Sequence, residues 1–456
     1  MNPRSGMKRM VNSFDPSKGP GDLAPDEASL LARRRRALGV LAPVFYEHPV
    51  HIVRGRGAHL FSADGADYLD CYNNVAVVGH ANPHVREAVA DQLTRQDTHT
   101  RYLQDEVVDY AERLLDTFPE PLDHVAFTNS GSESNDLALR MARTFTGHRG
   151  VVVTGNAYHG ITALVSSVSP SFGTGLPLAP FLVSVPVDDV LKHPDGTFDD
   201  PDVAACARAE LVARFEAAFT RLHDAGYGVS AVLLDQIFSS DGVLPGAAGW
   251  VGDVADAVHR AGGLLIADEV QSGFARTGER FWGFLRHQAD ADIVTMGKPM
   301  GNGIPTGAVV YKHGIGDTFA ECTRYFNTFG GNPVSMRAAG AVLDEIDRLG
   351  LQRRARDLGD QIAASMNDLL ADTPRFGGIR HSGLFLGVDV LADDGSGRPD
   401  PAAAARIIAA LRERRVLISG SAADGSSLKL RPPLVFSGSD ADRLLSALAD
   451  VKPLFG

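Results

Sequence analysis

The chain carries the stretch GLLIADEVQ at residues 263–271, in which a short apolar run ends directly on the carboxylate of Asp268. The run lacks polar alternation, which is the pattern of a strand buried on both faces of a sheet. Helical stretches separate several such runs, and this order is typical of parallel crossovers. The expected strands are 125–127, 151–153, 231–235, 264–268, 292–296 and 307–311. The sequence therefore predicts an α/β fold with a mostly parallel sheet.

The length of 456 residues exceeds what one hydrophobic core usually organises, so we expect more than one domain. Residues 1–28 are rich in Pro, Gly, Ser and Asp, and we expect a flexible leader there. Residues 29–70, with a helix and a hairpin around 50–70, would be the N-terminal segment of a small domain. The remaining parts are expected to be a large α/β domain over 71–340 and a small α+β C-terminal domain over 341–456.

The composition disfavours several classes of protein. A net charge of −12 disfavours binding to nucleic acid or to an anionic membrane. No apolar run approaches the ~20 residues of a membrane helix, and three widely spaced cysteines provide neither a disulfide framework nor a CxxC zinc pair. We therefore expect a cytoplasmic protein without a metal site. The four arginines at 33–36 are interpreted as a solvated helix face, with a nucleic-acid or targeting role as the alternative.

The glycine-rich stretch TMGKPMGNG at 295–303 follows another apolar run, so Lys298 is expected near the carboxyl end of a strand. Ligands of open α/β sheets bind at that edge, and glycines let the backbone approach them closely. A partly buried lysine has a lowered pKa and can form a Schiff base. Taken alone, Lys298 is more often a solvated loop lysine.

Three more features are expected at the same sheet edge. Asp268 needs a cationic partner such as a protonated pyridine nitrogen, with an ordinary salt bridge or helix cap as the alternative. The stretch NSGSESND begins a helix near Gly131 and Ser132, whose amides could bind a phosphate, unless the polar residues only cap the helix. Tyr158, followed by His159, could stack on a flat cofactor, although a lone aromatic there is more often part of the core.

Together these residues closely resemble the class III aminotransferases, which are pyridoxal 5′-phosphate (PLP) enzymes of fold type I. The likeness runs from about residue 45 to about residue 444. The matching segments are 73–75, 79–83, 127–135, 157–160, 267–278, 293–303, 325–333 and 429–434. The resemblance implies the PLP-dependent transferase fold type I, with a large domain and a smaller C-terminal α+β domain, and PLP as the cofactor.

The resemblance also implies a role for each matching residue. Lys298 would hold PLP through a Schiff base and then act as general acid–base, while Asp268 would bind the pyridine nitrogen. Thr328 would reach the phosphate of the neighbouring subunit, because the family works as a homodimer with shared active sites. The other cofactor residues would be Gly131 and Ser132 at the phosphate, Tyr158 and Val270 on the two ring faces, Gln271 at the ring hydroxyl, and His159.

Arg431 matches the arginine that grips a substrate carboxylate in many members, and its planar fork also suits phosphate. The motifs look most like the branch of alanine–glyoxylate aminotransferase-like proteins, which includes phospho-lyases acting on phosphoethanolamine and phosphohydroxylysine. One departure is Asp235-Gln236, where many members carry Glu-Pro and pair that glutamate with the arginine. This departure puts ornithine-type and 4-aminobutyrate-type substrate handling in doubt.

The sequence thus predicts a class III aminotransferase that moves an amino group from an amino acid or amine to a pyruvate-like oxo acid by a ping-pong mechanism. The alternative is a phospho-lyase, in which the same carbanion expels phosphate from an O-phosphoamine. A nicotinamide-dependent oxidoreductase is disfavoured because no GxGxxG lies between a strand and a helix. A non-catalytic protein that kept the fold is disfavoured by the intact set of Lys298, Asp268 and Thr328.

Overall fold

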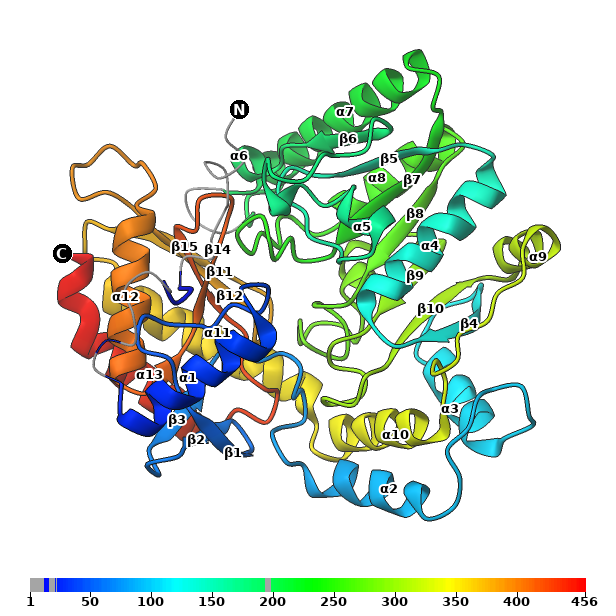
Figure 1. Ribbon diagram of the computed structural model, residues 1–456. Coiled ribbons are helices and arrows are strands. Elements are labelled where there is room, and N and C mark those ends of the chain that lie inside the picture. The colour runs from blue at the N-terminus through cyan, green and yellow to red at the C-terminus, as the bar shows by residue number, and fades with distance from the viewer. Residues whose placement is uncertain (1–11, 16–20, 22, 193–197) are drawn as a thin grey trace.

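The computed structural model describes residues 12–15, 21, 23–192 and 198–456. A seven-stranded sheet with the order β4-β10-β9-β8-β7-β5-β6 forms the centre of the larger part (Figure 1). Neighbouring strands are parallel except at β10, which is antiparallel to both β4 and β9. The strands are β4 (Leu122–Thr128), β5 (Gly150–Thr154), β6 (Leu182–Val185), β7 (Val229–Asp235), β8 (Leu264–Asp268), β9 (Ile293–Met296) and β10 (Gly307–Lys312). The mostly parallel sheet is confirmed, and β6 is an additional edge strand.

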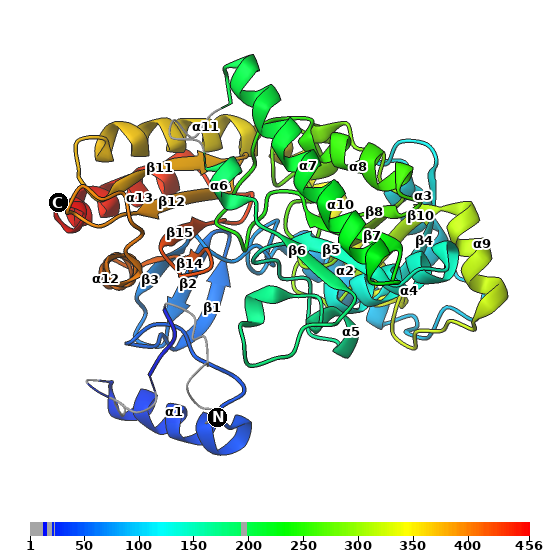
Figure 2. The ribbon, with the colours of Figure 1, turned by 90° about the horizontal axis from the view of Figure 1, so that it is seen from above.

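Helices cover both faces of this sheet, because successive side chains of a strand point to opposite faces. In β8, Ile266 packs on the side of α4, whereas Leu265 and Ala267 pack on the side of α7 and α8. Figure 2 shows the sheet between these two layers. The helices of this part are α2 (Pro83–Leu93), α3 (Asp105–Leu115), α4 (Gly131–Thr146), α5 (Ala163–Ser166), α6 (Asp188–Leu191), α7 (Pro201–Asp224), α8 (Trp250–Arg260), α9 (His313–Cys322) and α10 (Pro333–Arg348), with 3₁₀ turns at Pro170–Phe172 and Gly283–His287.

The smaller part contains an antiparallel sheet with the order β11-β12-β15-β14. Helices α11 and α12 pack against this sheet, and α13 packs against both helices. The elements are α11 (Leu351–Leu370), β11 (Phe376–His381), β12 (Leu386–Val390), α12 (Pro401–Glu413), β14 (Ser419–Ser421), β15 (Ser427–Leu430) and α13 (Gly438–Val451), with a 3₁₀ turn at Lys452–Phe455. Strand β11 was not expected from the sequence, because two adjacent glycines interrupt its apolar pattern.

The segment before residue 71 joins the smaller part through strand pairing. Strands β1, β2 and β3 form a three-stranded antiparallel meander in place of the expected hairpin, and β3 pairs in parallel with β13 of the C-terminal region. The elements are α1 (Pro25–Leu38), β1 (Ile52–Arg56), β2 (His59–Ser62), β3 (Asp67–Asp70) and β13 (Val416–Leu417).

The expected leader is partly structured. Helix α1 begins at Pro25, before the expected boundary at residue 28, and the Phe14 amide donates to the Val44 carbonyl at 2.8 Å. Residues 1–11, 16–20 and 22 of the leader lie outside the described residues. The arginines at 33–36 are exposed on α1, as predicted. Among the helices that the structure describes, none is long and apolar enough to cross a membrane.

Candidate active site

The carboxyl ends of β7, β8 and β9 lie side by side and bring polar residues to one edge of the large sheet. Asp235 of β7 pairs with Asp268 of β8, which pairs with Thr295 of β9, and Lys298 follows β9 by two residues. A cavity of about 190 Å³ at this edge is lined by Ser130, Gly131, Ser132, Tyr158, His159, Gly160, Asp235, Asp268, Val270, Gln271 and Lys298. The structure thus gathers every predicted cofactor residue except Thr328. We call this space the cofactor cavity.

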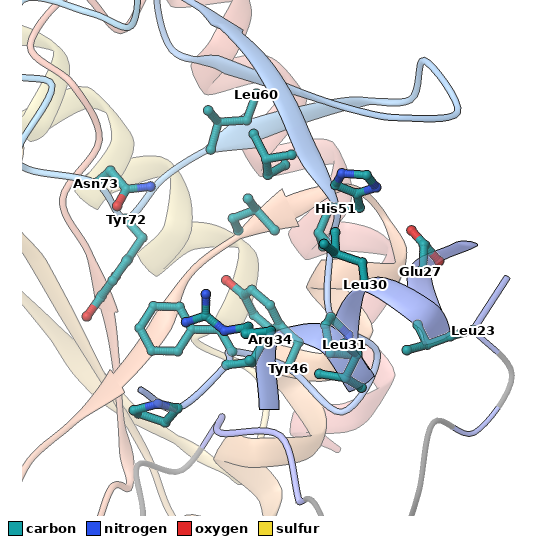
Figure 3. Close-up of a pocket in the computed structure, with 17 residues that line it drawn as sticks. Leu23, Glu27, Leu30, Leu31, Arg34, Tyr46, His51, Leu60, Tyr72 and Asn73 are labelled. Atoms are coloured by element: carbon teal, nitrogen blue, oxygen red, sulfur yellow. The ribbon is translucent and has the colours of Figure 1, made fainter. Parts of the chain in front are cut away.

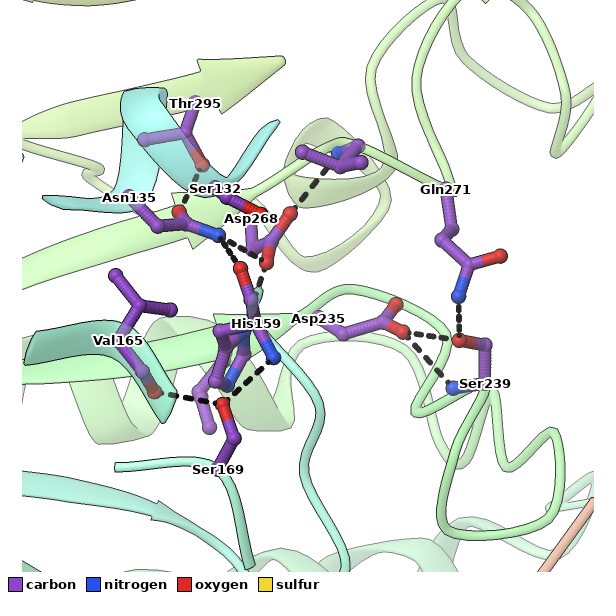
Figure 4. Close-up of polar contacts among 12 residues, drawn as sticks. Ser132, Asn135, His159, Val165, Ser169, Asp235, Ser239, Asp268, Gln271 and Thr295 are labelled. Atoms are coloured by element: carbon purple, nitrogen blue, oxygen red, sulfur yellow. Dashed lines mark hydrogen bonds and ion pairs between the residues drawn. The ribbon is translucent and has the colours of Figure 1, made fainter. Parts of the chain in front are cut away.

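Asp268 is held in one orientation by hydrogen bonds to both carboxylate oxygens (Figure 4). Its Oδ2 accepts from Asn135 Nδ2 at 2.8 Å and contacts His159 Nδ1 at 2.7 Å, while Oδ1 accepts from the Val270 amide at 3.0 Å. The Thr295 hydroxyl orients Asn135 by donating to its Oδ1 at 2.6 Å. Because the side chain is buried and fixed, Asp268 is well placed to pair with a cation in the cavity.

The N-terminus of α4 forms one wall of the cofactor cavity and offers backbone donors. Gly131 and Ser132 begin this helix, so their amides have no intrahelical acceptor, and the helix dipole favours an anion there. A Cβ on Gly131 would lie 2.6 Å from Val270 Cγ2, and one on Gly160, whose φ is +141°, would lie 2.5 Å from Ser132 Oγ. Glycine is therefore needed at both positions, and the helix start fits the predicted phosphate site.

The pKa of the Lys298 amine is lowered from 10.5 to about 8. Burial is the largest cause and the charge of Arg431 adds to it, whereas Asp268 and Asp235 act in the opposite direction. A larger share of the amine is therefore neutral near pH 7 than in an exposed lysine. A neutral amine is the form that attacks a carbonyl carbon, so the environment suits Schiff-base formation.

A second cavity of about 650 Å³ opens on the same lysine and extends to the smaller part of the chain. Tyr158, Gln271 and Lys298 line both cavities. Lys429 and Arg431 reach the second cavity from β15 and the residue beyond it, and their exposed fractions are only 7% and 8%. The second cavity, which we call the substrate cavity, thus presents two further basic side chains beside Lys298.

Both of these basic side chains bond to neutral oxygens. Arg431 Nε donates to the Tyr72 carbonyl at 2.9 Å, and its Nη1 donates to Gln271 Oε1. Lys429 Nζ donates to the Ser239 carbonyl at 2.8 Å. Burial, followed by the charge of Arg431, lowers the pKa of Lys429 well below its usual range. Within the described parts of the chain, no carboxylate forms an ion pair with either side chain.

Asp235 stands where many family members carry glutamate, and it does not pair with Arg431. Its carboxylate closes the turn after β7: Oδ1 accepts from the Ile237 amide at 3.0 Å, and Oδ2 accepts from the amide and hydroxyl of Ser239 at 3.0 and 2.5 Å. The Ser239 hydroxyl in turn accepts from Gln271 Nε2 at 2.7 Å (Figure 4). A neutral glutamine, rather than an acidic side chain, therefore faces Arg431.

Thr328 lines neither cavity and is exposed, as is its neighbour Phe329. The segment is anchored through Asn327, whose Nδ2 donates to Glu133 Oε2 at 2.8 Å and whose Oδ1 accepts from Asn129 Nδ2 at 2.9 Å. The anchor ties this segment to the beginning of α4, near the expected phosphate site. The role of Thr328 toward a neighbouring subunit stays a prediction.

Sequence reasoning missed several residues that shape the two cavities: Asn135, Ser239, Lys429 and Tyr72. Lys429 could have been found, because alternation along a strand places residues two apart on one face, and Arg431 was already singled out. Ser239 and Tyr72 lie in loops, where the sequence has no helical or strand periodicity from which the direction of a side chain could be predicted.

The donor set at the cofactor cavity suits PLP. Free helix amides match its phosphate, the fixed Asp268 carboxylate matches its ring nitrogen, and the lowered pKa of Lys298 matches its aldehyde. His159 Nε2 is buried without a hydrogen-bond partner, which leaves the ring free to serve Asp268 through Nδ1. In the part of the chain that the structure describes, no three His, Cys, Asp or Glu side chains are grouped to hold a metal ion.

Comparison with curated proteins finds relatives over nearly the whole chain. The chain is 40% identical to the alanine–glyoxylate aminotransferase 2-like protein of Drosophila melanogaster, over 90% of this chain and 84% of that protein. It is 33% identical to the ethanolamine-phosphate phospho-lyase homolog 1 of Caenorhabditis elegans, over 98% and 99%. The relatives thus carry names for two different reactions.

The similar solved structures also include enzymes described by two different reactions. A phospholyase from Arthrobacter in complex with phosphoethanolamine matches with a TM-score of 0.88 and 42% identity, over 93% of this chain and 99% of that chain. An (S)-enantioselective omega-transaminase from Thermomicrobium roseum matches with a TM-score of 0.81 and 28% identity, over 93% and 98%. Residues 42–451 match the model of the family described as aminotransferase class-III. The chain therefore belongs to the class III aminotransferases, a family of PLP-dependent enzymes.

Proposed function

We propose that this chain is a PLP-dependent phospho-lyase that releases phosphate from a small O-phosphoamine such as phosphoethanolamine. The observation that carries the proposal is the pair Lys429 and Arg431, which line the substrate cavity beside Lys298. A phosphate monoester has a charge of about −1.5 to −2 near neutral pH and several acceptor oxygens. Two cations whose hydrogen bonds go to neutral oxygens suit this group better than they suit a single carboxylate.

The electrostatics of the free site favour an incoming anion. Desolvation and the neighbouring Arg431 lower the pKa of Lys429, so the protonated form of this amine is disfavoured in the free site. A bound phosphate would reverse this effect, because an opposite charge in close contact favours the protonated amine. Phosphate binding and protonation of Lys429 are therefore expected to support each other.

In the proposed elimination each residue has a separate role. Bound PLP supplies an electron sink for the electron pair of the broken C–H bond. Lys298 Nζ takes the proton from the carbon that bears the amine, and its lowered pKa keeps part of it neutral for this step. Asp268 would hold a proton on the ring nitrogen of bound PLP. As the carbon–carbon double bond of the product forms, the bond between the adjacent carbon and the phosphate oxygen would break, and phosphate would leave toward Lys429 and Arg431.

The names of similar proteins support this reaction. The Arthrobacter structure is described as a phospholyase in complex with phosphoethanolamine, and the nematode relative is named an ethanolamine-phosphate phospho-lyase homolog. The second candidate is transamination between an amine and a pyruvate-like oxo acid. The fly relative's name favours it, and Arg431 alone could bind the carboxylate of an oxo acid.

We also infer a homodimer in which Thr328 approaches the phosphate site of the neighbouring subunit. Its exposure, together with the exposed Phe329, supports this role. A cytoplasmic location remains our proposal, supported by three free cysteines, one of them buried.

The test is to incubate the purified, PLP-loaded protein with amino acids, simple amines and O-phosphoamines while following phosphate and the cofactor spectrum. Catalytic phosphate release from phosphoethanolamine, with a spectrum that recovers unaided, is the expected result. A lasting spectral change that pyruvate reverses, without phosphate, would overturn the proposal and establish the aminotransferase.

A further inference from the structure

Tyr72 stands between the substrate cavity and a third cavity under α1. The third cavity has a volume of about 520 Å³ and is separate from the cofactor cavity. Tyr72 lines both the third cavity and the substrate cavity. The side chain therefore forms a wall shared by two spaces of similar size.

The ring of Tyr72 is packed from both sides. On the side of the substrate cavity, the guanidinium carbon of Arg431 lies 4.3 Å from the ring centroid. On the side of the third cavity, the Phe45 ring meets it edge to face, with centroids 5.6 Å apart and an interplanar angle of 83°. Cation–π and edge-to-face contacts both favour a fixed ring, so the wall is firm.

The third cavity is lined mainly by apolar side chains. Figure 3 shows Tyr72 on one side of it, with Leu30 and Leu31 of α1 on the other. The apolar lining includes Leu23, Leu30, Leu31, Val44, Phe45 and Val50. Such a surface accepts an alkyl chain, whereas the substrate cavity with Lys429 and Arg431 accepts an anion.

We propose that Tyr72 is a specificity-determining residue that limits the length of the substrate by separating the phosphate site from this apolar space. The inference rests on the proposed function, because it takes the cavity of Lys429 and Arg431 as the place of the substrate phosphate. Arg431 stacks on Tyr72, so an extension that runs from a phosphate at Arg431 toward the third cavity is blocked by the ring. The intact wall therefore selects compact phosphoamines.

The backbone of Tyr72 allows the wall to be removed without loss of the arginine's main-chain contact. The Tyr72 amide donates to Asp70 Oδ1 at 3.0 Å, and its carbonyl accepts from Arg431 Nε at 2.9 Å. Neither bond involves the ring, so Tyr72→Ala retains both. Tyr72→Phe retains the ring as well, which makes it the matched control.

The experiment measures phosphate release from a series of 1-amino-2-phosphooxyalkanes, from ethyl to octyl, by the PLP-loaded full chain. In the wild type and in Tyr72→Phe, kcat/KM is expected to fall steeply once the chain reaches the ring. In Tyr72→Ala, the longer members are expected to gain at least about tenfold relative to phosphoethanolamine, the scale of a few methylene contacts. The cofactor spectrum and Tm report that each variant is folded and loaded.

A second variant locates the gain. Leu31 is the buried residue of α1 and lines the third cavity, so Leu31→Trp in the Tyr72→Ala background fills the space that the extension would use. The double variant is expected to return to the wild-type length profile. A Tyr72→Ala protein that is folded and loaded but keeps the wild-type profile would overturn the inference, as would a gain that survives Leu31→Trp.

The proposed function is checked separately by phosphate release from phosphoethanolamine in the wild type. If the wild type transaminates instead, the same variants are compared on alkylamines of matching length. In that case the role of Tyr72 is supported only if Tyr72→Ala, and not Tyr72→Phe, accepts longer alkylamines than the wild type.

Discussion

The cofactor cavity and the substrate cavity share Lys298 but are built on different principles. In the cofactor cavity the polar side chains satisfy one another, as Asp268 does with Asn135 and His159. In the substrate cavity, Lys429 and Arg431 come from the smaller part of the chain and bond to neutral oxygens. A hydrogen-bonded network of this kind fixes one geometry, whereas basic side chains without a carboxylate partner remain available for an anionic ligand.

This difference separates chemistry from selection. Changes in the cofactor cavity should lower the rate for every substrate, because the hydrogen-bonded network positions the groups that react. Changes in the substrate cavity should alter substrate specificity and KM, because its side chains recognise the leaving group. Variants of single residues test whether the two cavities act separately in this way.

The largest effect is expected at Lys298, which lines both cavities. Lys298→Ala removes the amine that binds the cofactor and moves the proton, so kcat should fall on the order of 10⁴-fold. Phosphate release and the cofactor spectrum measure the loss. Lys429→Ala is the control, because it removes a neighbouring buried amine and should leave the cofactor spectrum intact. A folded Lys298→Ala protein with near wild-type turnover would contradict the assignment.

The next largest effect is expected at Asp268. Asp268→Asn keeps the size of the side chain but removes the charge that holds a proton on the ring nitrogen, so kcat should fall on the order of 10²-fold for every substrate. Asp235→Asn is the matched control, since Asp235 pairs with Asp268 across neighbouring strands but uses its carboxylate in a turn. Equal losses of kcat in the two variants would show that Asp268 has no special role.

Lys429 should affect substrate binding more than turnover. Lys429→Met keeps the length of the side chain and removes its charge, so KM for phosphoethanolamine should rise roughly tenfold with kcat nearly unchanged. Lys312→Met is the control, because that lysine pairs with Asp290 and Asp292 far from both cavities. The division between the cavities fails if Lys429→Met lowers kcat and leaves KM as it was.

The cofactor cavity could be predicted from the sequence because local rules place its residues. Asp268 ends an apolar strand, Gly131 begins a helix and Lys298 follows another strand, and parallel strands bring such ends to one edge. That prediction required neither the order of the strands in the seven-stranded sheet nor the close contacts of Gly131 and Gly160. The family resemblance then added roles that the pattern alone left open.

The substrate cavity could not be predicted in the same way, because it depends on how two parts of the chain pack. Ser239 lies in a turn where Phe238 and Val243 have φ values of +50° and +60°. Bulky residues rarely adopt positive φ, so the sequence does not predict such a turn. Arg431 and Gln271 were both predicted as site residues, but neither the hydrogen bond between them nor the role of the neighbouring Lys429 was. The second cation is the reason that phosphate elimination, first held as the alternative, becomes the proposed reaction.

Asp241 anchors a segment that leads to both cavities, and its replacement should give the smallest effect, a change in stability. Its Oδ2 accepts from the Thr154 hydroxyl and its Oδ1 from the Asn156 amide, each at 2.7 Å, and this segment leads to Tyr158. Burial raises the pKa of Asp241 from 3.8 to about 6. The folded state therefore holds the proton more tightly than the unfolded state, and stability falls as pH rises from about 4 through 6.

Asp241→Asn cannot ionise, so it should lack this fall. A pKa difference of about two units corresponds to about 3 kcal/mol, which for a chain of this length is a Tm difference of about 3 °C. Thermal unfolding of both proteins at pH 4 and pH 7 measures it: the wild type should lose about that much more than the variant. Asp224→Asn, at an exposed helix end, is the control. Because Asp241 touches neither cavity's reacting groups, a large change in kcat at pH 7 would show that the two cavities are coupled through the segment it anchors.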